Sequence, residues 1–166
     1  MIESLTQQIE RLTQQLAKGL LKQGGTLAVA ESCSGGWLAK VLTDIAGSSG
    51  WFNGGIVSYT NMAKQRLLNV SEGTLNEYGA VSEAVAGQMA EGALCVFDAD
   101  IAVAITGIAG PGGGTVEKPV GLVCFAVKQS GKSVCSNSKK FAGNREEVRQ
   151  QAVLMAIQLL AEKVID

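Results

Sequence analysis

Hydrophobic positions recur along the chain with the two periods that helices and strands produce. Residues 2–23 carry leucine and isoleucine three and four positions apart, which predicts an amphipathic helix ending at the glycine pair 24–25. A later helix is predicted after the cap residue Ser82, with an inner face of Val85, Met89, Ala93 and Val96. The last helix is predicted to begin with a capping box of Asn144 and Glu147. Its inner face is expected to hold Val148, Ala152, Met155 and Leu159.

Short apolar runs between the helices predict buried strands. These runs cover residues 26–30, 56–59, 100–105 and 120–127. The more polar stretch 133–141 predicts an antiparallel edge strand, and residues 47–55, with four glycines, predict a loop. Shorter helices are predicted over 37–45 and over 62–68, the second capped by Asn61. Alternating strands and helices predict one α/β domain over residues 1–166, a three-layer α/β/α sandwich with a mostly parallel sheet.

Composition and charge exclude several classes of partner. Hydrophobic residues make up 46% of the chain, charged residues 17% and aromatic residues 5%, and the net charge is −1. A nucleic-acid partner is not expected, because no cluster of cations could neutralise phosphates and few aromatic rings could stack on bases. A membrane partner is not expected either, since no apolar run approaches the roughly 20 residues that span a bilayer. With no signal peptide evident, a cytoplasmic location is expected.

The sequence contains no histidine, and this narrows the chemistry available to it. Ser-His-Asp and Cys-His mechanisms are excluded, so a general base must be lysine, tyrosine, a carboxylate or a thiolate. No metal and no cofactor are expected, because cysteine and carboxylate ligands alone would have to hold a zinc ion. The cysteines form no CxxC pair and are expected to be free thiols, with Cys95 packed in an apolar segment and both Cys124 and Cys135 structural.

Candidate chemistry begins in residues 31–36, which follow a predicted strand and read ESCSGG. Ligands of open α/β sheets bind at the carboxyl ends of strands, and the backbone N–H groups at a helix start suit an anion or a developing oxyanion. Ser32 is placed to be a nucleophile on a sharp turn between strand and helix. Serine is also favoured as a helix N-cap, and on this segment alone the N-cap is the simpler interpretation. Cys33 is a rival nucleophile, but packing is the simpler interpretation of its position.

A second candidate segment, residues 58–64, ends the next strand and opens a helix. Lys64 lies within the first turns of that helix, where the helix dipole and burial would both favour the neutral amine. A neutral amine is the base that a serine hydrolase without histidine needs. The alternative is an ordinary solvated lysine.

The third segment, residues 106–114, follows another buried strand and is rich in glycine. Residues 107–114 hold five glycines and one proline, which predicts a loop. The loop is similar in style to a phosphate cradle but matches no established phosphate-binding motif. A flexible connection is an equally good interpretation.

Together these segments resemble the CinA C-terminal family. The resemblance covers residues 5–162 and is carried by AESCSGG (30–36), YTNMAK (59–64) and ITGIAGPGGG with KPVG (105–114 and 118–121). It implies an α/β/α fold with a mixed sheet of five strands and self-association into a homo-oligomer. It also implies hydrolysis of the carboxamide of nicotinamide mononucleotide, a small-molecule nucleotide, to nicotinate mononucleotide and ammonia in pyridine-nucleotide salvage.

The resemblance also assigns roles to residues of this chain. It implies Ser32 as the nucleophile, with Lys64 taking its proton directly or through Tyr59. The residues expected to bind the substrate or its oxyanion are Cys33, Ser34, Gly35, Gly36, Thr106, Gly107, Gly110, Gly112 and Arg145. The family usually has a basic residue where this chain has 53–55, so Arg145 is the substitute candidate for a phosphate contact. A different class remains open, a nucleotide-binding or competence-related interaction protein without turnover.

Overall fold

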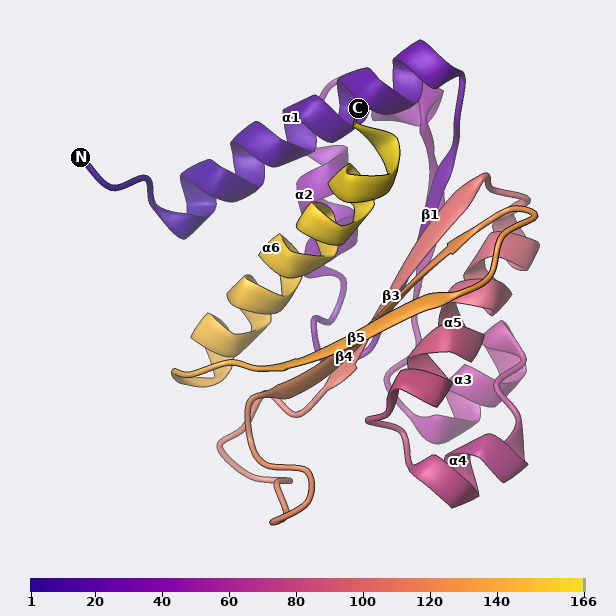
Figure 1. The fold of residues 1–166 in the computed structure, drawn as a ribbon, viewed down its shortest axis with the longest axis vertical. Helices are drawn as coiled ribbons and strands as arrows, with labels where there is room; N and C mark the ends of the chain where they lie inside the picture. Colours follow the sequence, from indigo (N-terminus) through magenta and orange to yellow (C-terminus); the bar gives the residue numbers. More distant parts are fainter. Residues whose placement is uncertain (166) are drawn as a thin grey trace.

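The computed structural model describes residues 1–165 as three layers, with a five-stranded sheet between two layers of helices (Figure 1). The strands are β1 (Leu27–Glu31), β2 (Phe52–Val57), β3 (Ile101–Gly107), β4 (Leu122–Gln129) and β5 (Cys135–Lys140). Their order across the sheet is β2-β1-β3-β4-β5. β1 is parallel to β2 and β3, whereas β4 is antiparallel to β3 and β5, so β4 alone runs against the other strands. The predicted fold class is confirmed.

The helices divide between the two faces of the sheet (Figure 1). One face is covered by α1 (Leu5–Gln23), α2 (Trp37–Thr43) and α6 (Arg145–Val164). The other is covered by α3 (Asn61–Leu68), α4 (Glu72–Tyr78) and α5 (Glu83–Phe97), and a short 3₁₀ turn, Ser48–Gly50, precedes β2. Within residues 1–165, none of these helices is both long and apolar enough to cross a membrane.

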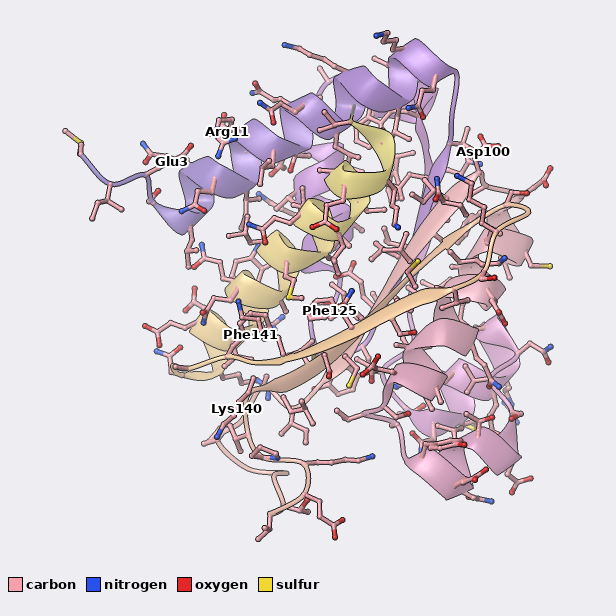
Figure 2. All side chains as sticks on the ribbon, viewed as in Figure 1. Glu3, Arg11, Asp100, Phe125, Lys140 and Phe141 are labelled. Atoms are coloured by element: carbon pink, nitrogen blue, oxygen red, sulfur yellow. The ribbon has the colours of Figure 1, made fainter. Side chains whose placement is uncertain are left out.

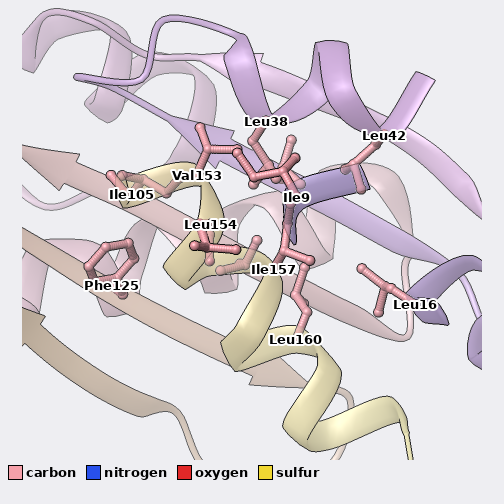
Figure 3. Packing of buried hydrophobic residues seen from close by; sticks show 14 of the residues in the cluster. Ile9, Leu16, Leu38, Leu42, Ile105, Phe125, Val153, Leu154, Ile157 and Leu160 are labelled. Atoms are coloured by element: carbon pink, nitrogen blue, oxygen red, sulfur yellow. The ribbon is translucent and has the colours of Figure 1, made fainter. Parts of the chain in front are cut away.

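Large and small side chains are separated between the two faces of the central strands. Branched and aromatic residues face α1, α2 and α6, among them Ile105 and Phe125, which pack against Leu154 and Ile157 of α6 (Figure 3). The opposite face carries mainly alanine: Ala28, Ala30, Ala102, Ala104 and Ala126. Because strand side chains alternate between faces, this pattern lets α5 lie close to the sheet. α5 in turn supports α3, the helix that carries Lys64.

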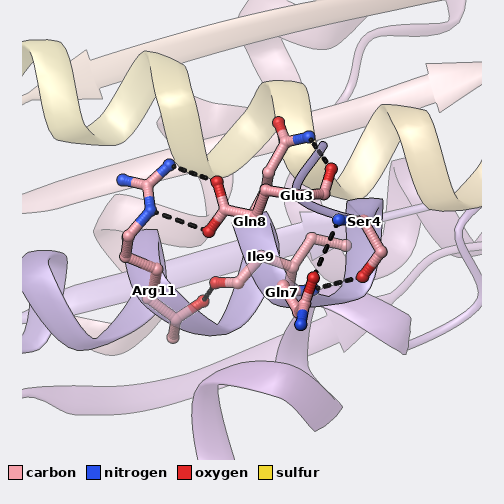
Figure 4. Close-up of polar contacts among 7 residues, drawn as sticks. Glu3, Ser4, Gln7, Gln8, Ile9 and Arg11 are labelled. Carbon is pink, nitrogen blue, oxygen red and sulfur yellow. Dashed lines mark hydrogen bonds and ion pairs between the residues drawn. The ribbon is translucent and has the colours of Figure 1, made fainter. Parts of the chain in front are cut away.

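Hydrogen bonds and a ring contact stabilise the regions where α1 and α6 begin. α1 begins with a capping box of Ser4 and Gln7, beside an exposed ion pair between Arg11 and Glu3 (Figure 4). α6 begins with the predicted box of Asn144 and Glu147. Each box satisfies backbone N–H groups that a helix start leaves unbonded. Between β5 and the start of α6, Phe141 packs edge-on against Phe125 with ring centroids 6.2 Å apart (Figure 2).

Several local predictions were wrong. Residues 47–55 were expected to form a loop, but β2 begins at Phe52 and ends at Val57. Gly54 and Gly55 lie in this strand, and the side chains of Phe97 and Val29 occupy the places where their Cβ atoms would lie. Glycine there reflects close packing, which sequence alone does not distinguish from a turn.

The remaining differences concern helix positions and thiols. α4 was not predicted, because its seven residues carry no apolar stripe. The cap of α3 is Thr60, one residue before the predicted Asn61. Val96 was expected on the inner face of α5 but is exposed. Cys95 and Cys135 are also exposed, on the solvent sides of α5 and of the edge strand, whereas Cys124 is buried as expected.

Gly92 of α5 faces the backbone of Leu68 at the end of α3, so that a Cβ atom there would overlap main-chain atoms. We expect Gly92→Ala to lower the free energy of unfolding by about 1–3 kcal/mol despite the better helix propensity of alanine. Urea unfolding measures this. Gly73→Ala in α4 is the matched control, because nothing lies within 4 Å of its Cβ position, and it should be neutral or stabilising. Equal stability of both variants would contradict the proposed close packing of α3 on α5.

Candidate active site

A cavity of about 270 Å³ lies at the carboxyl ends of β1 and β3, between these strands and α3. It is lined by Ser32, Cys33, Tyr59, Asn61, Lys64, Ala80, Val81, Thr106, Gly107, Ile108, Ala109, Gly110, Gly112, Gly113 and Arg145. The three segments singled out in the sequence therefore converge on one cavity. A larger hollow of about 880 Å³ lies between α1 and α2 and contains none of the predicted site residues.

Ser32 and Lys64 form the centre of this cavity. Ser32 directly follows β1, and its N–H donates to Ile105 O at 2.9 Å, which continues the pairing of β1 with β3. Its Oγ lies 3.0 Å from Lys64 Nζ, within hydrogen-bond distance. The Ser32 hydroxyl does not cap α2, because the N-cap of that helix is Gly36. The interpretation of Ser32 as an N-cap is therefore wrong.

Lys64 is buried without a counter-charge. Only 1% of the residue is exposed, and its Nζ donates to Ser58 O at 2.8 Å and to Tyr59 O at 3.4 Å. Within residues 1–165, ion pairs occur between Arg11 and Glu3 and between Lys40 and Asp44, and none involves Lys64. Loss of hydration therefore lowers the pKa of Lys64 below its ordinary value of 10.5. The interpretation of Lys64 as a solvated surface residue is wrong.

The turn after β1 is held by a buried carboxylate. Glu31 Oε1 accepts the N–H of Leu38 at 2.9 Å, and Oε2 accepts the N–H of Ala39 at 3.0 Å. The first N–H groups of α2 are therefore already bonded. Among the described residues, the N–H groups of Cys33 and Ser34 donate to no acceptor. Of the two residues only Cys33 lines the cavity, so its N–H, rather than the start of α2, remains available to an oxyanion.

The Cys33 thiol lines the cavity but is poorly suited to be a nucleophile. It is buried, and this burial raises its pKa to about 12. The thiol therefore stays protonated near neutral pH, and a thiol attacks far more slowly than a thiolate. The structure favours packing as the role of this side chain.

Tyr59 and Arg145 lie at the mouth of the cavity. The tyrosine is 57% exposed, and its hydroxyl accepts a hydrogen bond from Arg145 Nη2 at 3.0 Å. Arg145 Nη1 also donates to Gly110 O at 2.9 Å, so the guanidinium joins the segment after β2 to the glycine-rich loop. Tyr59 contacts Lys64 through its carbonyl oxygen. This geometry favours direct proton transfer between Ser32 and Lys64 rather than transfer through the Tyr59 hydroxyl.

The other predicted substrate contacts divide into two groups. Thr106, Gly107, Gly110 and Gly112 line the cavity, although the Thr106 hydroxyl is already committed to Ala80 O at 2.9 Å. In contrast, Ser34, Gly35 and Gly36 do not line it. The Ser34 hydroxyl is fully buried, and within the described residues it has no hydrogen-bond partner.

Sequence reasoning missed residues that line or support the site. Asn61, Ile108, Ala109 and Gly113 line the cavity from within the quoted motifs but were assigned no substrate contact, and Ala80 and Val81 line it from outside those motifs. Glu31 and Ser58 were part of the quoted segments but were given no role. Arg149 was not considered, although its position four residues after Arg145 places both on one side of a helix. Within residues 1–165, no group of three potential metal-ligating side chains occurs.

A buried serine–lysine pair at the edge of an α/β/α sheet is the arrangement expected of a hydrolase that works without histidine. The sequence pattern of the CinA C-terminal domain matches residues 9–164, and the chain belongs to this family.

Known proteins of similar sequence and structure support this family assignment. The nicotinamide-nucleotide amidohydrolase PncC of Escherichia coli (strain K12) is 48% identical to this chain, over 95% of this chain and 96% of the length of that protein. A CinA-like protein of Mycolicibacterium vanbaalenii is 51% identical over 84% of this chain, which corresponds to 33% of that longer protein. The crystal structure of the competence/damage inducible protein CihA from Agrobacterium tumefaciens superposes with a TM-score of 0.91, at 44% identity, over 93% of this chain and 94% of that one.

Because burial lowers the pKa of Lys64, stability should depend on pH in a defined direction. Between the folded-state pKa and 10.5 the unfolded chain binds more protons at this residue, so stability rises with pH there and levels off above 10.5. We expect the free energy of unfolding of the wild type, relative to Lys64→Met, to increase across this window. Urea unfolding from about pH 7 to about pH 11 measures it, with Lys18→Met on the exposed side of α1 as the control. A difference that stays flat or falls with pH would contradict the burial of an uncompensated amine.

Proposed function

We propose that the protein is a nicotinamide-nucleotide amidase, which hydrolyses the carboxamide of nicotinamide mononucleotide to nicotinate mononucleotide and ammonia in pyridine-nucleotide salvage. The observation that carries the proposal is the 3.0 Å contact between Ser32 Oγ and the buried Lys64 Nζ. The name of the Escherichia coli relative, 48% identical over nearly the whole chain, supports the choice of substrate.

Lys64 acts as the general base in its neutral form. A neutral amine has two N–H donors and one lone pair. In this form Nζ can keep donating to Ser58 O and Tyr59 O while its lone pair accepts the Ser32 hydroxyl, 3.0 Å away. The depressed pKa keeps a larger fraction of the amine unprotonated near neutral pH. Transfer of the hydroxyl proton to Nζ then activates Ser32 Oγ.

The reaction proceeds through an ester on Ser32. Oγ attacks the carboxamide carbon, and the negative charge that develops on the amide oxygen is stabilised by backbone N–H groups of the turn after β1. The tetrahedral intermediate collapses when the C–N bond breaks, and protonated Lys64 gives its proton to the departing nitrogen, which leaves as ammonia. Water then attacks the ester with Lys64 again as base, and the carboxylic acid and free Ser32 are released.

The rest of the nucleotide extends toward the mouth of the cavity. At about 270 Å³ the cavity lies just below the usual range for small-molecule sites, so it suits the nicotinamide end of the substrate. The cation at the mouth is Arg145, which is held between Tyr59 and Gly110. A guanidinium in this place fits the 5′-phosphate, which it can bind with two donors.

Purified protein should release ammonia from nicotinamide mononucleotide in the presence of a chelator and without added metal. We expect Ser32→Ala to lower kcat by at least about a thousandfold, because nucleophile and base act as a unit. An enzyme-coupled ammonia assay measures the rate. Ser130→Ala is the matched control, since this exposed serine lies in the turn between β4 and β5, away from the cavity.

Two other outcomes would redirect the interpretation. Equal ammonia release by the wild type and Ser32→Ala would remove Ser32 as nucleophile. No release by either protein, together with retained nucleotide affinity, would instead favour the second hypothesis from the sequence, a nucleotide-binding or competence-related interaction protein without turnover.

If Arg145 binds the phosphate, its removal should affect substrates according to whether they carry one. We expect Arg145→Ala to raise KM for nicotinamide mononucleotide by about 10- to 100-fold and to change KM for nicotinamide riboside little, because a charge-assisted bidentate contact is lost only with the former. Steady-state kinetics on both substrates give the comparison. A rise of equal size for both would show that Arg145 acts instead by holding Tyr59 and the loop.

Three further expectations from the sequence remain predictions. They are a single domain over residues 1–166, a cytoplasmic location, and assembly into a homo-oligomer. One continuous sheet with helices on both faces supports the first.

A further inference from the structure

We propose that Arg149 is a positioning residue for the reaction, which fixes the turn after β1 so that the N–H group of Cys33 can hold the oxyanion. This inference rests on the proposed function, because it requires acyl transfer at Ser32. Arg149 does not itself line the cavity, and it would act through the backbone of the turn.

Arg149 bridges two successive carbonyl groups of the turn after β1. From α6, its Nε donates to Cys33 O at 3.1 Å and its Nη2 donates to Ser34 O at 3.2 Å. The guanidinium also lies over the ring of Trp37, with Cζ 5.7 Å from the centroid. A planar cation with divergent donors suits this combination, whereas an ammonium group could not reproduce it.

These bonds determine where the N–H groups of the turn point. In a trans peptide the C=O and N–H bonds lie on opposite sides of the chain. With Ser34 O directed to the guanidinium, the N–H of Gly35 points away from Arg149. That N–H donates to Ser32 O at 3.0 Å, so the N–H of Cys33, in the same peptide as Ser32 O, points away from this bond. The N–H of Cys33 is unbonded among the described residues, and Cys33 lines the cavity.

The surrounding residues leave room for the guanidinium. Gly35 has a positive φ of +61°, and a Cβ atom there would lie 3.0 Å from Arg149 Nη2. Glycine is thus required both by the backbone conformation and by the cation packed against it. On the other side, the Glu31 carboxylate bonds the N–H groups of Leu38 and Ala39 and fixes the start of α2. The turn is therefore held from two sides, by Arg149 and by Glu31, and neither side chain bonds the N–H of Cys33.

The test compares Arg149→Ala and Arg149→Lys with Arg11→Ala, the matched control on the exposed face of α1. We expect Arg149→Ala to lower kcat for ammonia release by about 100-fold with KM changed by less than about threefold, because oxyanion donors act in the transition state. Arg149→Lys should retain an intermediate kcat, since one donor can still reach one carbonyl. Arg11→Ala should match the wild type.

Chemical rescue separates positioning from general structural support. Methylguanidinium, at concentrations well below those that unfold the protein, should restore much of the lost kcat of Arg149→Ala and none of that of Ser32→Ala. Wild-type kcat in Arg149→Ala would overturn the proposal. So would a loss of kcat that methylguanidinium fails to restore while thermal unfolding shows that the variant is folded.

A second substrate distinguishes failure of this inference from failure of the proposed function. If the wild type leaves nicotinamide mononucleotide intact, the amidase proposal fails, and Arg149 is then judged by acylation of Ser32 with p-nitrophenyl acetate, whose tetrahedral intermediate needs the same donors. Slower p-nitrophenol release in Arg149→Ala, restored by methylguanidinium, would support the positioning role. Release that is unchanged in Arg149→Ala, or that does not depend on Ser32, would overturn it.

Discussion

The structure depends on burying one amine without a counter-charge. Removing an ammonium from water costs several kcal/mol, and the fold offers Lys64 only carbonyl oxygens and a hydroxyl in return. Burial therefore lowers the pKa of Lys64, which favours the neutral amine that the proposed mechanism uses as its base. Three features hold the helix that buries Lys64 in place. Thr60 caps α3, α5 supports α3, and alanine on the facing strands lets α5 lie close to the sheet. Stability and reactivity are thus coupled through a single side chain.

The site is assembled from the ends of strands that are adjacent in space but distant in the chain. Because β1, β2 and β3 are parallel and neighbouring, the segments after them open on the same edge of the sheet. One brings Ser32, the next leads to Lys64, and the third supplies the loop at Gly110. Arg145 and Arg149, from the first turns of α6, then fasten two of these segments through backbone carbonyls.

A resemblance of sequence and the physical interpretation of the residues support each other at Ser32 and Lys64 but diverge elsewhere. The predicted anion site at the start of α2 is already occupied by Glu31, and the hydroxyl of Ser34 is buried away from the cavity. The glycines beside it serve the turn and its contact with Arg149. A motif therefore identifies where a site lies more securely than it identifies which atoms of the motif meet the substrate.

The sequence by itself determined the fold class, the three segments of the site and the requirement for a base other than histidine, because periodicity, strand ends and composition are local properties. It could not place β2 correctly, since glycine selected for close packing against Val29 is indistinguishable from glycine in a loop. Nor could it decide whether Lys64 is solvated or buried, or that Arg149 would reach a turn 116 residues away. Those outcomes depend on contacts between distant segments, and only the tertiary structure brings these together.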